Sequence, residues 1–557
     1  MFKPELFNSL KGYNGKTFLS DLIAGVIVGI VALPLAIAFA IASGVGPERG
    51  LFTAIIAGFC ISFFGGSKVQ IGGPTGAFAV IVFGVVQEFG FAGLATATVM
   101  AGILLILLGV FKMGGLVKFI PYTIVTGFTA GIAVTIFVGQ IGDFLGLTTG
   151  KMPGDFIGKI GVYAKSITTI NWYSFGMALI SLIIIFVWPK VSKKIPGSLI
   201  VIILATLLNL VLEKTLGWHT DTIGSRYGEI PSSLPAPALP DFSIGAITKL
   251  FPTAISIAVL AAIESLLSAV VADGMIGSKH DSNTELVAQG IANIASPLFG
   301  GIPATGAIAR TATNIKNGGR TPIAGIVHAV VLLLIMMLLG KYAVYIPMAA
   351  LSAVLVSVAW NMAGLPAVKA LLKGQKSDIC VLLVTFLITV FIDLTVAIEV
   401  GLGFAAFFFI KKMIDVSEVR EQRSSIVGGI TTVNPINPDT AEESLEIPAG
   451  VLVYEIEGPL FFGTVQKFEQ SVERAKIDYK VIILRMRNTI YLDAGGLRAL
   501  EQLKEACDKK GVTIVLSGIH TQPYLLLQKT GMAKILGEEN IYDHIDKALQ
   551  RAENLVK

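Results

Sequence analysis

Apolar runs of about 20 residues recur along most of this chain, and they restrict its fold more than any other feature. Such a run, folded as a helix, is long enough to cross the roughly 30 Å hydrocarbon core of a bilayer. The runs lie between Leu22 and Val416 in a chain of 557 residues. Only 15% of the residues are charged, against roughly 25% in soluble proteins. The sequence therefore predicts a polytopic α-helical membrane protein.

The apolar runs and the Gly, Pro and charged residues between them predict fourteen transmembrane segments. An even number places both termini on one side, and most lysines and arginines flank that side. The positive-inside rule then predicts cytoplasmic termini and a multi-pass protein of the plasma (inner) membrane. The segments begin near Leu22, Gly50, Pro74, Phe91, Ile120, Phe175, Gly197, Leu250, Glu285, Ala304, Pro322, Ala343, Asp378 and Val396.

One phrase occurs twice, as IGGPTGAFAV from Ile71 and as GGIPATGAIAR from Gly300. The aligned copies, which start with Thr75 and Thr305, are 230 residues apart. They open the third and the tenth predicted segments, which are seven segments apart. Because seven is odd, a repeated seven-span unit has inverted topology, as in many secondary transporters.

Each copy has glycines and a proline that end an extended stretch and can start a helix. The first N–H groups of a helix that starts within the membrane are unpaired and carry partial positive charge, so they favour an anion. We therefore predict an anion site built from the two helix starts, with added hydroxyl groups. The alternative is a pair of hinges without a ligand. The predicted backbone and hydroxyl positions are Thr75, Gly76, Ala77, Thr305, Gly306 and Ala307.

Two charged residues lie within or beside these segments. Glu264 lies in the middle of the eighth predicted segment, where a carboxylate needs a partner, a proton or a bound cation. Ser268 is four residues further on the same helical face. Arg310 follows the second copy of the phrase and would add a fixed positive charge near the anion. The alternatives are an ion pair within the bundle for Glu264 and an arginine that reaches the membrane surface for Arg310.

The composition changes after Val416, where charged residues become frequent and short strand patterns alternate with amphipathic helices. We predict a transmembrane domain at 1–416, a linker at 417–448 and a cytoplasmic α/β domain at 449–557.

Three stretches resemble the sulfate permease (SulP) family of anion transporters. They are ALPLAIAFAIASGVGPERGLFTA, AIESLLSAVVADGMIGSKHDSNTELVAQGIANI and GGIPATGAIARTATNIKNGGRTPIAG. The resemblance implies two inverted seven-span repeats, in which spans 1–4 and 8–11 form a mobile core and the others a gate. It also implies that the anion lies between the starts of segments 3 and 10, beside Phe39, Ala77, Phe78, Ala309 and Arg310. The resemblance further implies that Glu264 couples transport to an ion.

The C-terminal region resembles a STAS domain. In bacterial regulators of this fold, one loop is phosphorylated on a serine. The corresponding loop here is Asp493-Ala494-Gly495-Gly496 and contains no serine. The resemblance therefore does not imply a phosphorylation switch at this loop.

These observations predict a secondary active transporter of small inorganic anions, of the sulfate or bicarbonate class, that works by elevator-type alternating access. The coupling ion is H⁺ or Na⁺, with a sodium site at Glu264 and Ser268 left open. The alternatives are a dicarboxylate/proton symporter of the same fold, an exchanger without cation coupling, a nucleobase carrier, and a receptor or channel. We expect a homodimer in the lipid bilayer, and no enzyme activity, cofactor or nucleic-acid partner.

Overall fold

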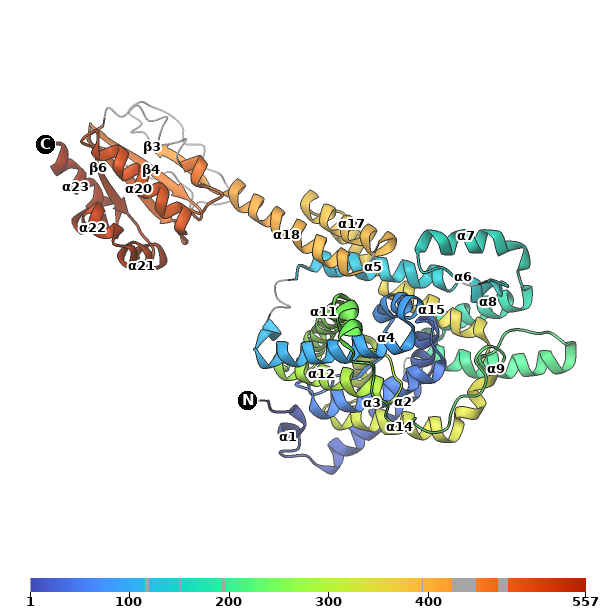
Figure 1. Cartoon of the computed structure of the whole chain (residues 1–557). Coiled ribbons are helices and arrows are strands. Elements are labelled where there is room, and N and C mark those ends of the chain that lie inside the picture. Colours follow the sequence, from blue (N-terminus) through green and yellow to red (C-terminus); the bar gives the residue numbers. More distant parts are fainter. Residues whose placement is uncertain are drawn as a thin grey trace. The chain divides into compact units, whose positions relative to one another are not determined.

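The computed structural model describes residues 2–115, 120–150, 152–192, 196–392, 394–422, 447–468 and 479–557. The chain forms two compact units, Met1–Gly403 and Phe404–Lys557. The first is a bundle of helices and the second an α/β domain (Figure 1). This agrees with the predicted division into a helical membrane part and an α/β part.

The first unit contains long apolar helices, short connecting helices and two very short strands. Its helices are α1 (Glu5–Ser9), α2 (Gly15–Ala42), α3 (Pro47–Phe64), α4 (Gly76–Val110), α5 (Tyr122–Gly139), α6 (Ile141–Leu145), α7 (Phe156–Ser166), α8 (Trp172–Val187), α9 (Gly197–Leu216), α10 (Ile223–Tyr227), α11 (Ile244–Ile276), α12 (Ser282–Leu298), α13 (Ile308–Lys316), α14 (Ile323–Leu339), α15 (Met348–Met362), α16 (Leu365–Leu371) and α17 (Lys376–Phe391), with α18 (Leu394–Val416) running into the second unit. The strands are β1 (Gly72–Gly73) and β2 (Thr305–Gly306).

Within the described residues, nine helical stretches are long and apolar enough to cross a membrane unaided. One of them, α4, is interrupted at Gly90, whose φ of 67° is not helical. The third and fourth predicted segments, which begin near Pro74 and Phe91, therefore correspond to the two halves of α4. The tenth corresponds to α13, which has only nine residues. The helical membrane fold is confirmed, whereas the exact number of fourteen spans remains a prediction.

The helices of the first unit pack in two groups. In one group α12 packs on α3 and α4, α11 on α4, and α14 on α2 and α3. In the other, α5 packs on α17, and α15 on α5 and α8. Glycines allow the closest approach: a Cβ atom on Gly102 of α4 would lie 2.7 Å from the carbonyl oxygen of Gly290 of α12. Small residues of this kind are typical of helix contacts in membranes.

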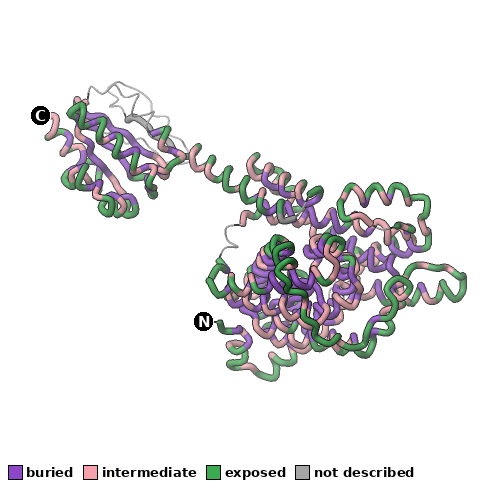
Figure 2. Tube along the Cα trace, in the orientation of Figure 1, coloured by how far each residue is buried: buried purple, intermediate pink, exposed green. Residues whose placement is uncertain are grey.

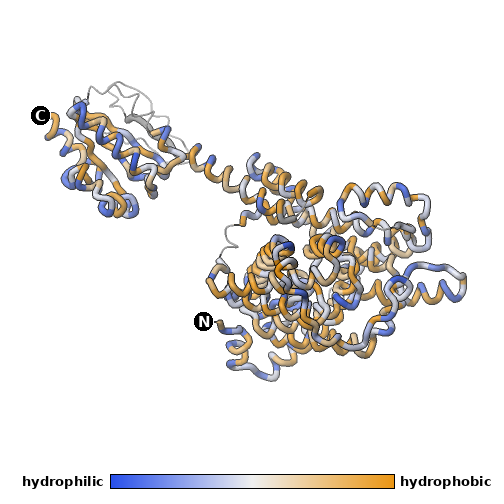
Figure 3. Tube along the Cα trace, in the orientation of Figure 1, coloured by the Kyte–Doolittle hydropathy of each residue, from blue (hydrophilic) through white to orange (hydrophobic). Residues whose placement is uncertain are grey.

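The surface of the first unit is largely apolar. Figure 2 shows exposed residues along the outer helices, and Figure 3 shows that many of these stretches are hydrophobic. On α8 and α9, for example, Ile183 and Leu207 are about half exposed. Such a surface fits contact with lipid, because a water-exposed apolar area of this extent would be costly.

The second unit is built on a five-stranded sheet in the order β3-β4-β5-β6-β7. Strand β3 pairs antiparallel with β4, and the remaining neighbours are parallel. The strands are β3 (Glu418–Gln422), β4 (Val451–Glu457), β5 (Val481–Asn488), β6 (Thr513–Ser517) and β7 (Ile541–Tyr542), and the helices are α20 (Ala494–Asp508), α21 (Thr521–Thr530), α22 (Met532–Leu536) and α23 (Ile545–Val556).

The predicted linker at 417–448 needs a correction, because its first residues form β3 and complete the sheet. Their charged composition resembles a linker, but pairing with β4 satisfies the backbone of an edge strand whatever its side chains. Residues 423–446 of that stretch lie outside the described residues.

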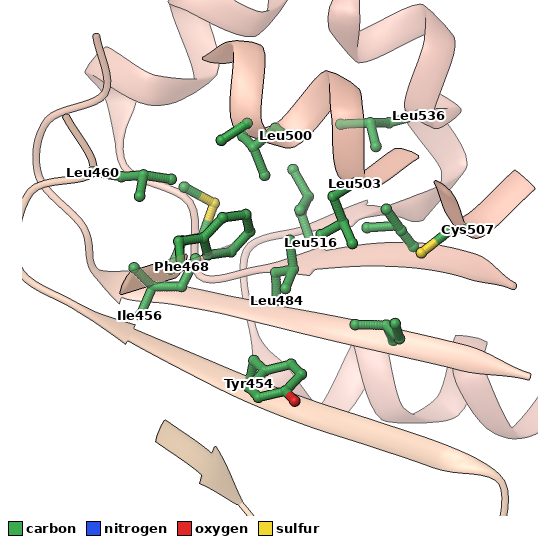
Figure 4. Packing of buried hydrophobic residues seen from close by; sticks show 14 of the residues in the cluster. Tyr454, Ile456, Leu460, Phe468, Leu484, Leu500, Leu503, Cys507, Leu516 and Leu536 are labelled. Atoms are coloured by element: carbon green, nitrogen blue, oxygen red, sulfur yellow. The ribbon is translucent and has the colours of Figure 1, made fainter. Parts of the chain in front are cut away.

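Both faces of this sheet are covered by helices. Tyr454 and Leu484 point to the face covered by α20, as Figure 4 shows. Val453 and Ile483 belong to the opposite face, where α23 packs. This alternation follows the two-residue period of a strand. Cys507 is fully buried in the first cluster, and burial raises the pKa of its thiol to about 11.

Candidate functional site

The two copies of the repeated phrase meet in the structure as an antiparallel strand pair. Gly72 of β1 pairs with Gly306 of β2, and Gly73 pairs with Thr305. Continued by one residue, the register places Pro74 opposite Ala304, which is its equivalent under the 230-residue offset. The local two-fold axis expected of an inverted repeat therefore passes between these two residues.

Side chains from neighbouring elements hold the extended approaches to the strands. The Ile71 N–H donates to Thr311 Oγ1 (3.0 Å), and Asn314 Nδ2 donates to the Val69 carbonyl (2.9 Å). In the second copy, Asn293 of α12 both donates to the Ala304 carbonyl (2.8 Å) and accepts from its N–H (2.9 Å). These bonds replace the water that a non-helical backbone would need at membrane depth.

The two helix starts are not equivalent. Helix α4 begins at Gly76, as the repeat predicts, but α13 begins at Ile308, two residues later than its equivalent position. The Gly306 N–H donates to Ser265 Oγ (3.1 Å), and the Ala307 N–H donates to the Ile71 carbonyl (2.8 Å). The prediction that Gly306 and Ala307 offer backbone donors to an anion is therefore wrong, because each N–H already has a protein acceptor.

The first N–H groups of both helices lack a side-chain cap. On α13 they belong to Ile308 and Ala309, and both residues are exposed. On α4 they belong to Gly76 and Ala77, which are buried. Uncapped helix starts of this kind favour an anion.

The two threonines of the phrase contact α11. The Thr75 hydroxyl donates to Glu264 Oε2 at 2.8 Å. Thr305 Oγ1 lies 2.6 Å from Ser265 Oγ and 3.2 Å from the Ala261 carbonyl. We predicted that both hydroxyls add donors to the anion site, but in the structure both bond to α11 instead.

Glu264 is half-buried on α11 and reaches the start of α4 through Thr75. Ser268, predicted as its neighbour in a coupling-ion site, instead lies 3.5 Å from Thr311 Oγ1. Sequence reasoning missed Ser265, although it directly follows Glu264. The repeated phrase could have indicated Ser265, because the equivalent hydroxyls of Thr75 and Thr305 each need a polar partner.

Arg310 reaches from α13 to the first copy of the phrase. Its side chain is 2% exposed, and Nη2 donates to the Pro74 carbonyl at 3.1 Å. Among the described residues, Nε and Nη1 have no hydrogen-bond partner, and no carboxylate forms an ion pair with the guanidinium. A buried charge without a partner is costly, so these free donors suit a bound anion.

The remaining predicted positions form an apolar wall. A Cβ atom on Gly76 would lie 3.2 Å from the Phe39 ring, 3.1 Å from Ile136 Cδ1 and 3.1 Å from Met362 Sδ. Phe39 belongs to α2, whereas Ile136 and Met362 belong to α5 and α15 of the other packing group. Phe78, in the first turn of α4, is fully buried. The site therefore lies where the two packing groups face each other.

Comparison with known proteins identifies the fold and its family. The model of the sulfate permease family matches residues 18–385, and the model of the STAS domain matches residues 444–548. The chain belongs to the sulfate permease family. Members of this family transport sulfate, bicarbonate and related anions, and are not enzymes.

The relatives match along nearly the whole chain. "Putative sulfate transporter YvdB" of Bacillus subtilis (strain 168) is 44% identical over 96% of this chain and 98% of its own length. The bicarbonate transporter BicA of Synechocystis sp. is 30% identical over 96% of this chain and 94% of its own. In each case the alignment includes the C-terminal domain.

Two solved structures share the architecture. The transmembrane domain of a cyanobacterial bicarbonate transporter BicA, 32% identical, matches with a TM-score of 0.61 over 71% of this chain and 98% of its own. Murine Slc26a9, an anion transporter in the inward-facing state, matches with a TM-score of 0.87 over 99% of this chain and 94% of its own. At 21% identity the second likeness shows the fold alone.

Proposed function

We propose that this protein is a secondary active transporter of a small inorganic anion of the sulfate or bicarbonate class. The observation that carries the proposal is Arg310, whose buried guanidinium keeps two free nitrogen donors beside two uncapped helix starts. The anion would lie between the starts of α4 and α13, against Phe39 and Gly76. The names of the relatives YvdB, a putative sulfate transporter, and BicA, a bicarbonate transporter, support this substrate class.

Coupling would pass through Glu264. Its carboxylate accepts from Thr75, which directly precedes α4. A proton or a sodium ion at Glu264 would therefore neutralise a negative charge close to the anion. This would strengthen anion binding, because charges interact strongly in a weakly polar site. The hydrogen bond between Thr75 and Glu264 would thus link the proposed coupling site to the proposed anion site.

Transport would follow elevator-type alternating access. The packing group of α2–α4 and α11–α14 carries most of the proposed site, and α5 and α15 face it from the other group. A movement of one group along the other would carry the anion across the plasma membrane. In this proposal the protein is a homodimer in the lipid bilayer, with both termini in the cytoplasm.

Uptake into proteoliposomes tests the function. Labelled sulfate and bicarbonate are offered under an imposed proton gradient and then a sodium gradient, with unlabelled dicarboxylates as competitors. We expect accumulation of an inorganic anion that depends on one of the two gradients. Uptake that needs only a counter-anion would indicate an exchanger, and strong competition by dicarboxylates would indicate the symporter alternative.

The variant Glu264→Gln should abolish gradient-driven accumulation and leave the protein folded, because an amide of similar size cannot carry a proton or hold a cation. Glu88→Gln is the matched control, since Glu88 is an exposed carboxylate on α4. Accumulation at the wild-type level in Glu264→Gln would contradict the coupling role.

A further inference from the structure

A lysine on the short helix α7 is buried without a charged partner. Lys159 is 8% exposed, and its ammonium lies 4.4 Å from the centre of the Phe83 ring of α4. Within the part of the chain that the structure describes, no carboxylate lies within ion-pair distance of Lys159. Asp155, at the start of the same helix, accepts from the Gly158 N–H. A buried ammonium is costly unless another group compensates its charge, and one aromatic ring compensates only part of it.

Lys159 lines a cavity of about 100 Å³ between the two packing groups. Ile41 of α2 and Ala79 and Phe83 of α4 form one side, and Thr135 and Gln140, at the end of α5, contribute to the other. At about 30 Å³ per water molecule, the cavity holds roughly three waters, which is also the size of a four- or five-atom oxyanion.

The cavity lies on the same helices as the proposed anion site. Phe83 follows Gly76 by seven residues on α4, about 10 Å along the helix. Ile41 follows Phe39 by two residues on α2. The cavity therefore lies beside the proposed anion site, on the side toward α7.

The cavity wall carries one cation, Lys159, and one carboxylate, Asp143, and only the carboxylate has an ion-pair partner. Asp143 is the only carboxylate among its lining residues, and it is paired with Arg226 at 2.6 Å. Arg226 is also paired with Asp221, at 2.8 Å. The Tyr163 hydroxyl donates to the Gly139 carbonyl at 3.3 Å. Among the residues that the structure describes, Lys159 is then the one charged group of the cavity wall that forms no ion pair.

We propose that Lys159 and this cavity form a second, transient site for the transported anion, at the α7 end of its passage. This inference rests on the proposed function. The ammonium supplies the charge that attracts the anion, and the weakly polar protein around the cavity strengthens this attraction. A single lysine holds the anion less firmly than Arg310 with two helix starts, so the anion moves on.

Charge and packing at Lys159 can be separated by substitution. Lys159→Met keeps an unbranched apolar chain against Phe83 but removes the charge, whereas Lys159→Arg keeps the charge. Lys165→Met is the control, because Lys165 lies on the same helix and is exposed. Uptake of labelled sulfate and bicarbonate is measured over a range of anion concentrations, with the α7 face exposed to the label.

We expect Lys159→Met to lower uptake roughly tenfold at low anion concentration, the scale of electrostatic capture effects. The maximal rate should stay within about twofold, since the central site is intact. Lys159→Arg and Lys165→Met should behave like the wild type. A wild-type KM in Lys159→Met would overturn the inference and leave Lys159 as a packing residue only.

A second measurement does not depend on transport. Acetic anhydride should modify Lys159 more slowly when sulfate or bicarbonate is present, while modification of Lys165 stays unchanged. If the wild type moves neither anion, the proposed function fails, and this protection still tests the cavity. Equal modification of Lys159 with and without both anions would overturn the second site.

Discussion

At the scale of single residues, Thr75 and Thr305 hold equivalent positions of the repeated phrase but bond to different groups. Thr75 is half-buried and bonds to the Glu264 carboxylate, whereas Thr305 is fully buried and bonds to Ser265 and a backbone carbonyl. The first hydroxyl can therefore influence coupling, and the second chiefly holds β2 on α11.

We expect Thr305→Val to lower the free energy of unfolding by about 1 kcal/mol, the usual net value of a hydrogen bond. Thr75→Val should lower the free energy of unfolding by at least as much and also reduce gradient-driven accumulation, because the Glu264 carboxylate loses its hydrogen-bond donor. Thermal unfolding and uptake of the two variants are compared side by side. Equal effects of both variants on both measurements would contradict the different roles.

At the scale of elements, the β1–β2 pair decides where Arg310 lies. Gly73 has a φ of 150°, which side chains rarely adopt, and a Cβ atom there would overlap Arg310 Nη1. The glycine thus leaves room for the guanidinium against the backbone of the first copy. An inverted repeat brings this about because it faces two such breaks toward each other.

Gly73→Ala should therefore displace Arg310 and weaken anion binding by at least about tenfold, or 1.4 kcal/mol. Gly84→Ala on α4 is the matched control, since a Cβ atom there would contact nothing within 4 Å. Binding is measured as the dependence of uptake on anion concentration. Unchanged affinity in Gly73→Ala would mean that Arg310 does not contact the anion.

At the scale of the whole molecule, each compact unit has its own core. The second unit buries two apolar clusters, one on each face of its sheet. In the first unit, most residues of the proposed anion site come from α2, α4, α11, α13 and the segments that lead into them, and α5 and α15 face these residues. The second unit contributes no residue to the proposed anion site.

A chain that ends after Val416 should still insert and bind the anion, with an affinity within about tenfold of the wild type, or 1.4 kcal/mol. We expect a lower transport rate but an intact binding site, because the second unit contributes no proposed ligand of the anion. Uptake by the truncated and the full chain is measured at equal amounts of inserted protein. A larger fall in affinity would place part of the site beyond residue 416.

The sequence by itself determined the class of fold, the α/β domain after the membrane part, and the two places where a helix starts within the membrane. These features depend on local composition and on a repeat, which a linear reading detects. It also singled out Glu264 and Arg310, because charges inside apolar segments are costly.

Only the tertiary structure decided which donors remain free for a ligand. The N–H groups of Gly306 and Ala307, like the two threonine hydroxyls, are taken by partners at least 40 residues away in the chain. Lys159 lies between two predicted membrane segments, in a stretch that the sequence suggests is a loop. Only the tertiary structure places its ammonium against the Phe83 ring. The physical reason is the same in each case: whether a polar donor stays free for a ligand depends on the protein partners that long-range packing brings to it.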